Sequence, residues 1–260
     1  MFKERLLSSL VFAPLVAGAF YLGGPYFMAF ILLVATLGAI EYRRIVILAG
    51  IDMSSLFVAV SALVALTGYI RPSVFVAALF GGAVLLLSIA LVRTGSAPSA
   101  MYSLSGEMYI GGFLGALTIL RAGPSGRTWG FLALLVTWAA DVGAYLGGLA
   151  LGRHKLAPAI SPGKSWEGAV CGLAAATLAG AILSGPLGFP AGFSTISGAI
   201  LGVLAELGDL VGSSLKRFAK VKDSGKIIPG HGGILDRFGS LLFTGAGGLL
   251  IRTLHGLMFR

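Results

Sequence analysis

The sequence predicts an all-α integral membrane protein, and three observations support this fold class. Hydrophobic residues make up 57% of the 260 residues, and charged residues make up only 11%. Mean hydropathy is +0.94, whereas a soluble globular chain carries about 25% charged residues. Apolar runs long enough to cross a bilayer, about 17 to 25 residues each, recur along the chain. These features exclude a soluble domain, and segments of period-two alternation are too few for an outer-membrane barrel.

The apolar runs predict about nine transmembrane helices. Their expected positions are 8–22, 25–40, 54–70, 74–92, 103–120, 128–150, 168–185, 194–214 and 238–257. Lys3 and Arg5 precede the first run, as they would in a secretory signal, but a second apolar run follows after only Gly-Gly-Pro. We therefore expect the first run to be a retained helix.

The distribution of lysine and arginine predicts a cytoplasmic N-terminus. With that orientation, most of the 19 lysines and arginines fall in cytoplasmic segments, as the positive-inside rule requires. The net charge of +9 is then concentrated on one face, where it attracts anionic lipid head groups and phosphorylated metabolites. A nucleic-acid partner is not expected, because no soluble basic domain is present to hold a duplex.

Two polar loops mark the expected functional part of the chain. We expect N-terminal transmembrane helices in 1–125 and C-terminal transmembrane helices in 126–260, with cytoplasmic catalytic loops at 152–167 and 215–237. Each loop directly follows a helix that contains carboxylates. Cys171 is the single cysteine, so the chain forms no intrachain disulfide, and we expect this residue to serve packing.

Carboxylates within predicted membrane helices are the first candidate site residues. Asp141, Glu206 and Asp209 lie in such helices, where an ionised side chain costs about 2.5 to 3.5 kcal/mol and usually has a partner and a function. A structural ion pair or a hydrogen bond between helices is the alternative for Asp141 and Glu206.

Polar side chains continue from Glu206 towards the cytoplasm at helical spacing. At about 100° per residue they fall within an arc of roughly 80°, provided that the helix continues past the membrane. They are Glu206, Asp209, Ser213, Lys216 and Lys220. A carboxylate near the boundary can hold a hard cation such as Mg²⁺, while lysines reach phosphate oxygens. Snorkelling explains one pair such as Lys216 and Arg217, but not six cations interleaved with Asp223 and Asp236.

The end of the second loop has the composition of an anion-binding turn. Residues 229–233 read Pro-Gly-His-Gly-Gly, in which proline fixes φ and the glycines allow backbone N–H groups to approach a ligand. His231 is a candidate phosphate donor or metal ligand, with a hydrogen-bonded turn histidine as the alternative. Asp236 supplies a carboxylate for metal, and Arg237 supplies a guanidinium group whose paired N–H donors suit phosphate.

The first loop contains Gly-Lys-Ser at 163–165 but not a Walker A motif, which would need glycine where Pro158 stands. Ser161, Lys164 and Ser165 are candidates for phosphate contact, and an ordinary solvated loop is the alternative.

The stretch from Ser213 to Phe238, SSLKRFAKVKDSGKIIPGHGGILDRF, resembles the signature of the phosphatidate cytidylyltransferase (CDP-diacylglycerol synthase) family. The Lys-Arg, Lys-Asp, Pro-x-His-Gly-Gly and Asp-Arg positions are all filled at the family's spacing. The family's usual pattern ends in aspartate, where this chain has Gly239. The segment DVGAYLGGLALGRHKLAPAISPGKSWEG, residues 141–168, also resembles a second region of that family.

The resemblance implies nucleotidyl transfer from CTP to phosphatidate in phospholipid biosynthesis, with Mg²⁺ and a possible second cation, at the inner (plasma) membrane and with the site facing the cytoplasm. It implies a homodimer in a lipid bilayer. It assigns metal binding to Asp209 and Asp236, with Asp223 and Asp141 as further candidates. Catalytic residues are then Asp209, Asp236, Lys216 and Arg217. Residues for the substrates are Ser213, Lys222, His231, Gly232, Gly233, Arg237, Ser161 and Lys164.

Two alternatives remain open. One is a cytidylyltransferase for another lipid phosphate, such as a polyprenyl or ether lipid phosphate. The other is an ion-coupled transporter that uses the intramembrane carboxylates Asp141 and Asp209. An inverted repeat with matched broken helices would favour the transporter, and we find none in the sequence.

Overall fold

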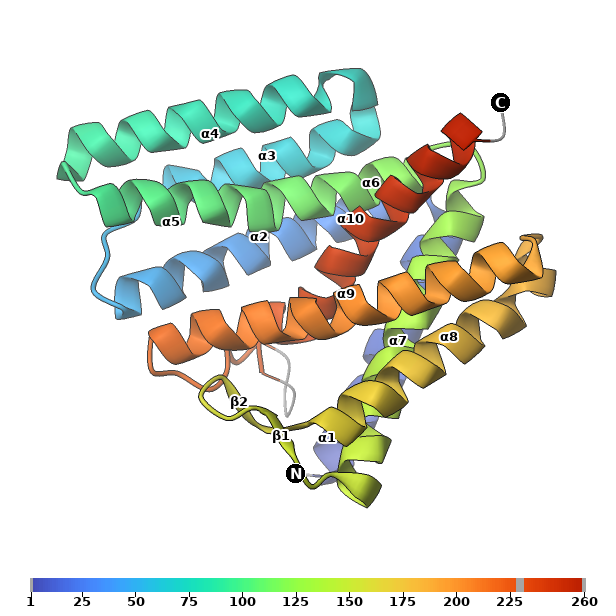
Figure 1. The fold of residues 1–260 in the computed structure, drawn as a ribbon. Coiled ribbons are helices and arrows are strands. Elements are labelled where there is room, and N and C mark those ends of the chain that lie inside the picture. The colour runs from blue at the N-terminus through green and yellow to red at the C-terminus, as the bar shows by residue number, and fades with distance from the viewer. Residues whose placement is uncertain (1, 228–231, 259–260) are drawn as a thin grey trace. The chain divides into compact units, whose positions relative to one another are not determined.

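The computed structural model describes residues 2–227 and 232–258, except for the side chains of residues 2–9 and 258. Apart from one short hairpin, the regular structure of this part of the chain is helical (Figure 1). The elements are α1 (Phe2–Leu22), α2 (Gly24–Leu48), α3 (Leu56–Ile70), α4 (Pro72–Thr94), α5 (Ala97–Glu107), η1 (Met108–Gly112), α6 (Phe113–Ala122), α7 (Gly126–Leu151), β1 (Lys155–Ala157), β2 (Ser161–Ser165), α8 (Trp166–Leu187), α9 (Ala191–Phe218) and α10 (Leu235–Met258).

The chain divides into two compact units. Unit 1 comprises Met1–Arg127 and Leu215–Phe238, and unit 2 comprises Thr128–Ser214 and Gly239–Arg260. The last turn of α9 and the first turn of α10 therefore belong to unit 1, together with the loop that joins these helices. We describe each unit by itself.

Helices of unit 1 pack around aromatic and branched aliphatic side chains. Helices α3, α4 and α5 lie side by side (Figure 1). Side chains that are almost completely buried include Phe20, Phe27, Ile31, Phe57, Leu114 and Leu117. Arg121, at the end of α6, donates from Nε to the carbonyl of Phe20 at 2.6 Å, which satisfies an acceptor at the end of α1. Close packing and end capping thus hold these helices together.

A π-helical turn, η1, interrupts the continuous helix formed by α5 and α6 and follows a buried glutamate. Glu107 is fully buried, and its Oε2 accepts a hydrogen bond of 2.5 Å from Ser61 on α3. A Cβ atom on Gly82 would lie 3.1 Å from Glu107 Oε1, so this glycine leaves room for the carboxyl group. The glutamate is therefore built into the interior of unit 1.

Small residues allow α8 of unit 2 to pack closely against α7 and α9. Its buried residues are Gly168, Gly172, Ala176 and Gly180, which recur every four residues on one face. A Cβ atom on Gly198 of α9 would lie 2.6 Å from the carbonyl oxygen of Ala176. Ser194 Oγ donates to the carbonyl of Gly180 at 2.7 Å. These glycines therefore serve close helix packing.

The all-α prediction does not include the hairpin between α7 and α8. Strands β1 and β2 pair antiparallel within the expected loop 152–167. Glu167 accepts hydrogen bonds from the backbone N–H groups of Arg153 and His154, and Ser165 caps α8 by accepting from the Gly168 N–H at 3.1 Å. These side-chain contacts to the backbone fix both ends of the hairpin, and period-two alternation is too short here to predict it.

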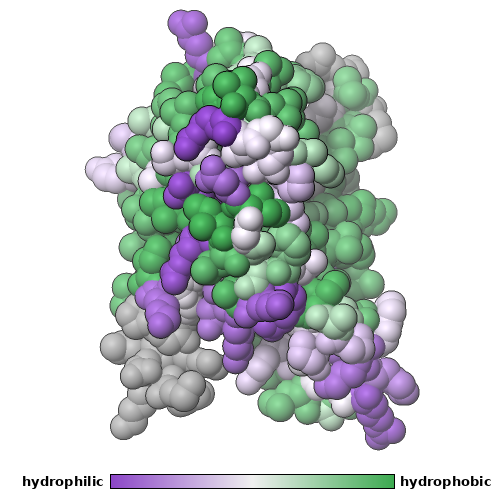
Figure 2. Space-filling model, turned by 90° about the vertical axis from the view of Figure 1, so that its left-hand side faces the viewer, coloured by the Kyte–Doolittle hydropathy of each residue, from purple (hydrophilic) through white to green (hydrophobic). Residues whose placement is uncertain are grey.

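Five helices in the described residues are long and apolar enough to cross a membrane, which indicates a multi-pass membrane protein. They are Pro72–Thr94, Ala97–Ala122, Gly126–Leu151, Trp166–Leu187 and Ala191–Phe218. Predicted spans 8–22 and 54–70 coincide with the shorter apolar helices Leu10–Leu22 and Leu56–Ile70. The remaining two predicted spans lie in α2 and α10. Hydrophobic side chains cover much of the visible surface, and hydrophilic ones gather in a few places (Figure 2).

Helix α9 ends earlier than the polar stripe on its sequence predicts. It stops at Phe218, and Lys220 adopts a left-handed conformation with φ of 55°. The Val221 N–H bonds to the Lys216 carbonyl at 3.0 Å, and the Lys220 N–H to the Arg217 carbonyl at 2.9 Å, as in a Schellman motif. The prediction that Lys220 continues the stripe is therefore wrong, because this motif closes the helix before that residue.

Candidate active site

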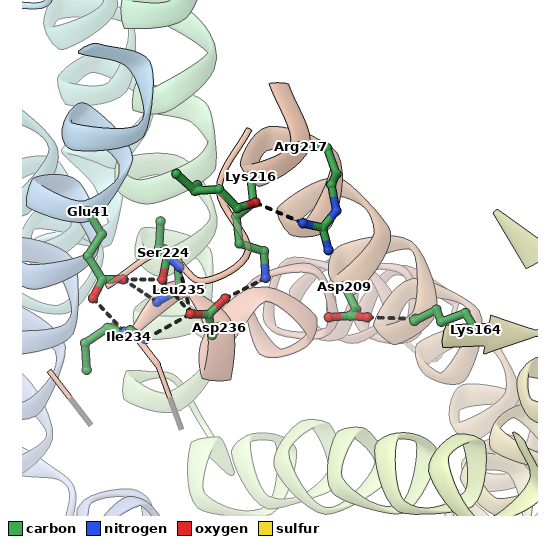
Figure 3. Close-up of polar contacts among 11 residues, drawn as sticks. Glu41, Lys164, Asp209, Lys216, Arg217, Ser224, Ile234, Leu235 and Asp236 are labelled. Atoms are coloured by element: carbon green, nitrogen blue, oxygen red, sulfur yellow. Dashed lines mark hydrogen bonds and ion pairs between the residues drawn. The ribbon is translucent and has the colours of Figure 1, made fainter. Parts of the chain in front are cut away.

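Two clusters of polar residues, one in each unit, contain several of the predicted site residues. The first, which we call the loop cluster, consists of Glu41, Lys216, Ser224, Gly233 and Asp236 (Figure 3). Lys216 Nζ lies 2.5 Å from Asp236 Oδ1, and only 16% and 6% of these side chains are exposed. The last turn of α9 and the first turn of α10 thus hold a nearly buried ion pair that sequence spacing alone does not predict.

Backbone and side-chain donors also surround the second oxygen of Asp236. Asp236 Oδ2 accepts from the N–H groups of Ser224 at 2.8 Å and Gly233 at 2.9 Å, and Ser224 Oγ lies 3.0 Å away. Burial by itself raises the pKa of Asp236, but the hydrogen bond from Lys216 and those from the backbone outweigh it, so the net pKa is lowered. Asp236 is therefore held as a carboxylate.

Glu41 is a member of the loop cluster that sequence reasoning missed. It lies on α2, is 3% exposed and accepts hydrogen bonds from Ser224 Oγ at 2.7 Å and from the N–H groups of Ile234 and Leu235 at 2.9 Å each. The available signal was an acidic residue at the end of an apolar run, next to Arg43 and Arg44. That signal equally suits an interfacial side chain, so it could not identify the contact.

The second cluster, which we call the lysine–carboxylate cluster, lies in unit 2 and consists of Lys164, Glu206, Asp209 and Asp141. Lys164 Nζ on β2 lies 2.6 Å from Glu206 Oε2 and 2.9 Å from Asp209 Oδ2 on α9; Figure 3 shows the second contact. Asp141 on α7 accepts from Ser240 Oγ at 3.1 Å and interacts electrostatically with Asp209, Lys164 and Glu206. Carboxylates from the helices that precede the two polar loops, α7 and α9, thus belong to one cluster in this unit.

The charge of Lys164 is maintained by its two carboxylate partners. Burial lowers the pKa of Lys164, but Asp209 and Glu206 raise it by more, so the net pKa is raised. The ammonium group consequently stays charged at neutral pH and can neutralise either a carboxylate or an incoming phosphate. A Cβ atom on Gly172 would lie 3.1 Å from Glu206 Oε1, so the close packing of α8 also leaves space for this glutamate.

Comparison of the sequence with known proteins identifies the family of this chain. Residues 3–254 match the cytidylyltransferase family. The chain belongs to this family. It is 37% identical over 258 residues to a phosphatidate cytidylyltransferase of Pseudomonas aeruginosa, with 93% of each chain covered. It is 34% identical over 276 residues to one from Synechocystis sp., again with 93% of each chain covered, and 48% identical over 121 residues to one from Bacillus subtilis.

The metal expected from the resemblance fits one cluster better than the other. Carboxylate oxygens of the kind in Asp209 and Glu206 suit Mg²⁺, which commonly takes one or two protein carboxylates and completes its shell with water and substrate phosphates. Among the described residues, no three histidine, cysteine, aspartate or glutamate side chains form a preformed metal site. Both oxygens of Asp236 already have donors, so its carboxylate suits Lys216 better than a metal.

The other predicted residues differ in their exposure and contacts. Arg217 Nη1 donates to the Val221 carbonyl at 3.0 Å (Figure 3). Ser213 is half-buried on α9, Ser161 is half-buried on β2, and Lys222, Asp223 and Arg237 are exposed. Gly232 has a φ of 85°, as expected for an anion-binding turn. His231 lies outside the described residues.

Gly239, where the resemblance leads one to expect aspartate, lies at a close helix crossing. A Cβ atom on Gly208 of α9 would lie 2.5 Å from the Gly239 carbonyl oxygen on α10. The backbones of the two helices therefore approach each other within unit 2 at this pair of glycines. Gly239, which departs from the family pattern, thus occupies a helix-packing position directly after the signature.

Proposed function

We propose that the protein transfers the cytidylyl group of CTP to phosphatidate, giving CDP-diacylglycerol and pyrophosphate. A phosphate oxygen of phosphatidate forms a bond to the α-phosphorus of CTP, and the bond from that phosphorus to the β-phosphate bridging oxygen breaks. The observation that carries the proposal is the similarity to a phosphatidate cytidylyltransferase over 93% of both chains. No protein nucleophile is needed, because the lipid itself supplies the attacking oxygen.

The chain's own cations suit the binding of two anionic substrates. Lys216 and Lys164 are both held by carboxylates, at 2.5 Å from Asp236 and 2.6 Å from Glu206. Ammonium groups fixed in this way stay charged and oriented, so they can bind phosphate oxygens when a substrate arrives. We assign further phosphate contacts to Ser213, Arg217 and Arg237.

The glycine turn and the loop residues complete the proposed substrate site. Gly232 offers its backbone N–H group to the triphosphate of CTP, and Gly233, whose N–H donates to Asp236, shapes the turn. His231, Lys222 and Ser161 are assigned to further contacts with the substrates. Asp236 keeps Lys216 oriented. Asp223 remains a secondary metal candidate because it is exposed.

We propose Mg²⁺ as the cofactor, held by Asp209 with support from Glu206 and Asp141. When bound, it neutralises charge on the triphosphate and the leaving pyrophosphate. Such a site would need the phosphates of CTP as additional ligands, in keeping with the few carboxylates that the protein offers. The site of a second cation stays a prediction from the resemblance.

We also propose a topology and an assembly for the protein. About nine membrane segments follow from the apolar runs, and a cytoplasmic N-terminus with polar loops on the cytoplasmic side follows from the distribution of lysine and arginine. The inner membrane follows from the family resemblance. CTP is water-soluble and the diacyl chains are not, so a site at this membrane face receives both. The homodimer rests on the family resemblance.

The test is pyrophosphate release by the purified protein in detergent with CTP and Mg²⁺, with and without phosphatidate. We expect release to require phosphatidate, and Asp236→Asn to lower it by about 100-fold or more, because Lys216 then loses the partner that orients it towards the negative charge of the transition state. The matched control is Asp52→Asn. It should retain full activity, because Asp52 is an exposed acidic residue outside both clusters.

Other outcomes of this assay identify the alternatives. Release with a polyprenyl or ether lipid phosphate, but not with phosphatidate, would move the chain to a related cytidylyltransferase activity. Absence of release with every lipid phosphate would contradict the proposed reaction and favour the transporter. Full activity of Asp236→Asn would remove Asp236 from the site.

A further inference from the structure

Glu41 performs a capping function for a helix far from it in sequence. The first N–H groups of a helix lack intrahelical acceptors, and α10 begins at Leu235. Its opening N–H groups, those of Ile234 and Leu235, each donate to Glu41 at 2.9 Å. A carboxylate at a helix N-terminus is also favoured by the helix dipole. Glu41 therefore fixes where α10 starts, and with it the position of Asp236 one residue further on.

The same carboxylate also holds the other end of the glycine-rich loop. Ser224 Oγ donates to Glu41 Oε2 at 2.7 Å. Gly225 and Gly233 flank the loop at 226–232, and a Cβ atom on either would collide with the Glu41 carboxylate. Both glycines thus permit a close approach to one side chain of α2. Glu41 clamps the two ends of the loop at one point, as Figure 3 shows for Ser224, Ile234 and Leu235.

Ser224 connects this clamp to the ion pair. Its single hydroxyl proton has two carboxylate acceptors, Glu41 Oε2 at 2.7 Å and Asp236 Oδ2 at 3.0 Å. The Ser224 N–H also donates to Asp236 at 2.8 Å. Because a hydroxyl donates only one hydrogen bond, the shorter contact to Glu41 leaves the backbone N–H to serve Asp236. A change at Glu41 therefore reaches Asp236, and through it Lys216.

We propose that Glu41 is a positioning residue for nucleotide binding: it does not touch the substrate but holds Ser224 and the start of α10 so that Asp236 orients Lys216 towards the triphosphate of CTP. This inference rests on the proposed function, since it takes CTP as the ligand of Lys216. Glu41→Gln keeps the size of the side chain but replaces one acceptor oxygen with an NH₂ group. That group faces a donor among Ser224, Ile234 and Leu235, so at least one of these contacts is lost.

The experiment compares CTP binding at equilibrium by wild type, Glu41→Gln and Glu107→Gln, each purified to a single species in detergent. Glu107 is the matched control, because it is also a buried glutamate of unit 1, and its hydrogen-bond partner is Ser61 of α3 and not a residue of the loop. We expect Glu41→Gln to weaken CTP binding about tenfold, the effect of losing a hydrogen bond to a charged group. Glu107→Gln should bind CTP as wild type does.

A purely structural role predicts a different result. In that case Glu41→Gln lowers the melting temperature while the folded fraction binds CTP with unchanged affinity and shows an unchanged KM for CTP. Unchanged affinity would overturn the inference. Absence of CTP binding by wild type would instead contradict the proposed function, so the two failures are distinguishable.

A second pair of variants keeps the inference testable if Glu41→Gln does not fold. Ser224→Ala removes only the hydroxyl that joins Glu41 to Asp236, and Gly225→Ala pushes a methyl group against the Glu41 carboxylate. We expect each variant to weaken CTP binding by about three- to tenfold, whereas the control Glu107→Gln should bind CTP as wild type does. Wild-type affinity in both folded variants would also overturn the proposal.

Discussion

Asp236 keeps a negative charge in a nearly buried position because its neighbours supply three donors. They are the Lys216 ammonium group and the backbone N–H groups of Ser224 and Gly233. Removing one partner of such a pair leaves the other buried and unpaired, which is strongly destabilising. The residue thus contributes both to stability and to the orientation of Lys216, and the two contributions respond differently to pH and to mutation.

The lowered pKa of Asp236 predicts how stability changes with pH. A carboxyl group whose pKa is lowered by folding stabilises the protein at pH values above its unfolded pKa of about 3.9, and that stabilisation is lost as pH falls through the folded pKa. Asp236→Asn should therefore lower the free energy of unfolding by roughly 3 kcal/mol at pH 7. Thermal unfolding in detergent should show this difference shrinking between pH 5 and pH 3, as protonation removes the ion pair from wild type. A difference that stays constant over this range would contradict the assignment.

Single residues also mark the limit of prediction from sequence. Asp209, Lys216 and Asp236 were selected from their types and spacing, but spacing gave no partner for them. Asp209 pairs with Lys164 on β2, and Lys216 pairs with Asp236, while Glu41 of α2 holds the neighbouring Leu235 N–H across 194 positions. Such contacts depend on tertiary packing, and helical periodicity carries no information about them.

Close helix packing in unit 2 depends on some glycines of its helices and not on others. A Cβ atom on Gly198 would lie 2.6 Å from the Ala176 carbonyl, whereas one on Gly192 of the same helix would meet nothing within 4 Å. Glycine to alanine substitution in a helix interior is by itself stabilising by about 0.5 to 1 kcal/mol. Substitution of Gly198 by alanine therefore combines a gain in helix propensity with a loss of packing. At Gly192 only the gain in helix propensity applies.

This contrast gives a prediction with an internal control. Gly198→Ala should destabilise the protein by about 1 to 3 kcal/mol, because overpacking pushes α9 away from α8. Gly192→Ala should leave the melting temperature unchanged or slightly raised. Equal melting temperatures of the two variants would mean that α8 and α9 do not pack as closely as described.

Element boundaries were predicted well where apolar runs are long and less well at their ends. The run at 194–214 identifies α9, but the helix ends at Phe218 because Lys220 takes a left-handed conformation. Neither lysine nor its neighbours indicate this, since glycine is the usual residue at such a position. The short hairpin of β1 and β2 was missed for a related reason: side-chain contacts of Glu167 and Ser165 with the backbone define its ends.

At the scale of the whole molecule, the family match spans residues 3–254 and therefore covers both units. Composition predicted a helical membrane protein, and the signature at 213–238 predicted the family that the comparison shows. Composition could not reveal that the signature folds back on Glu41, or that Lys164 pairs with Glu206 and Asp209. Family resemblance identifies the chemistry, whereas the contacts explain how the residues are held.

The most direct test of the central claim follows the two ends of the CTP triphosphate separately. Purified protein in detergent is given phosphatidate, Mg²⁺ and CTP labelled either at the α-phosphate or at the γ-phosphate, and the products are divided between organic solvent and water. We predict that the α-label enters the lipid phase as CDP-diacylglycerol while the γ-label stays in water as pyrophosphate. An α-label that remains in water, or a γ-label that enters the lipid phase, would contradict it.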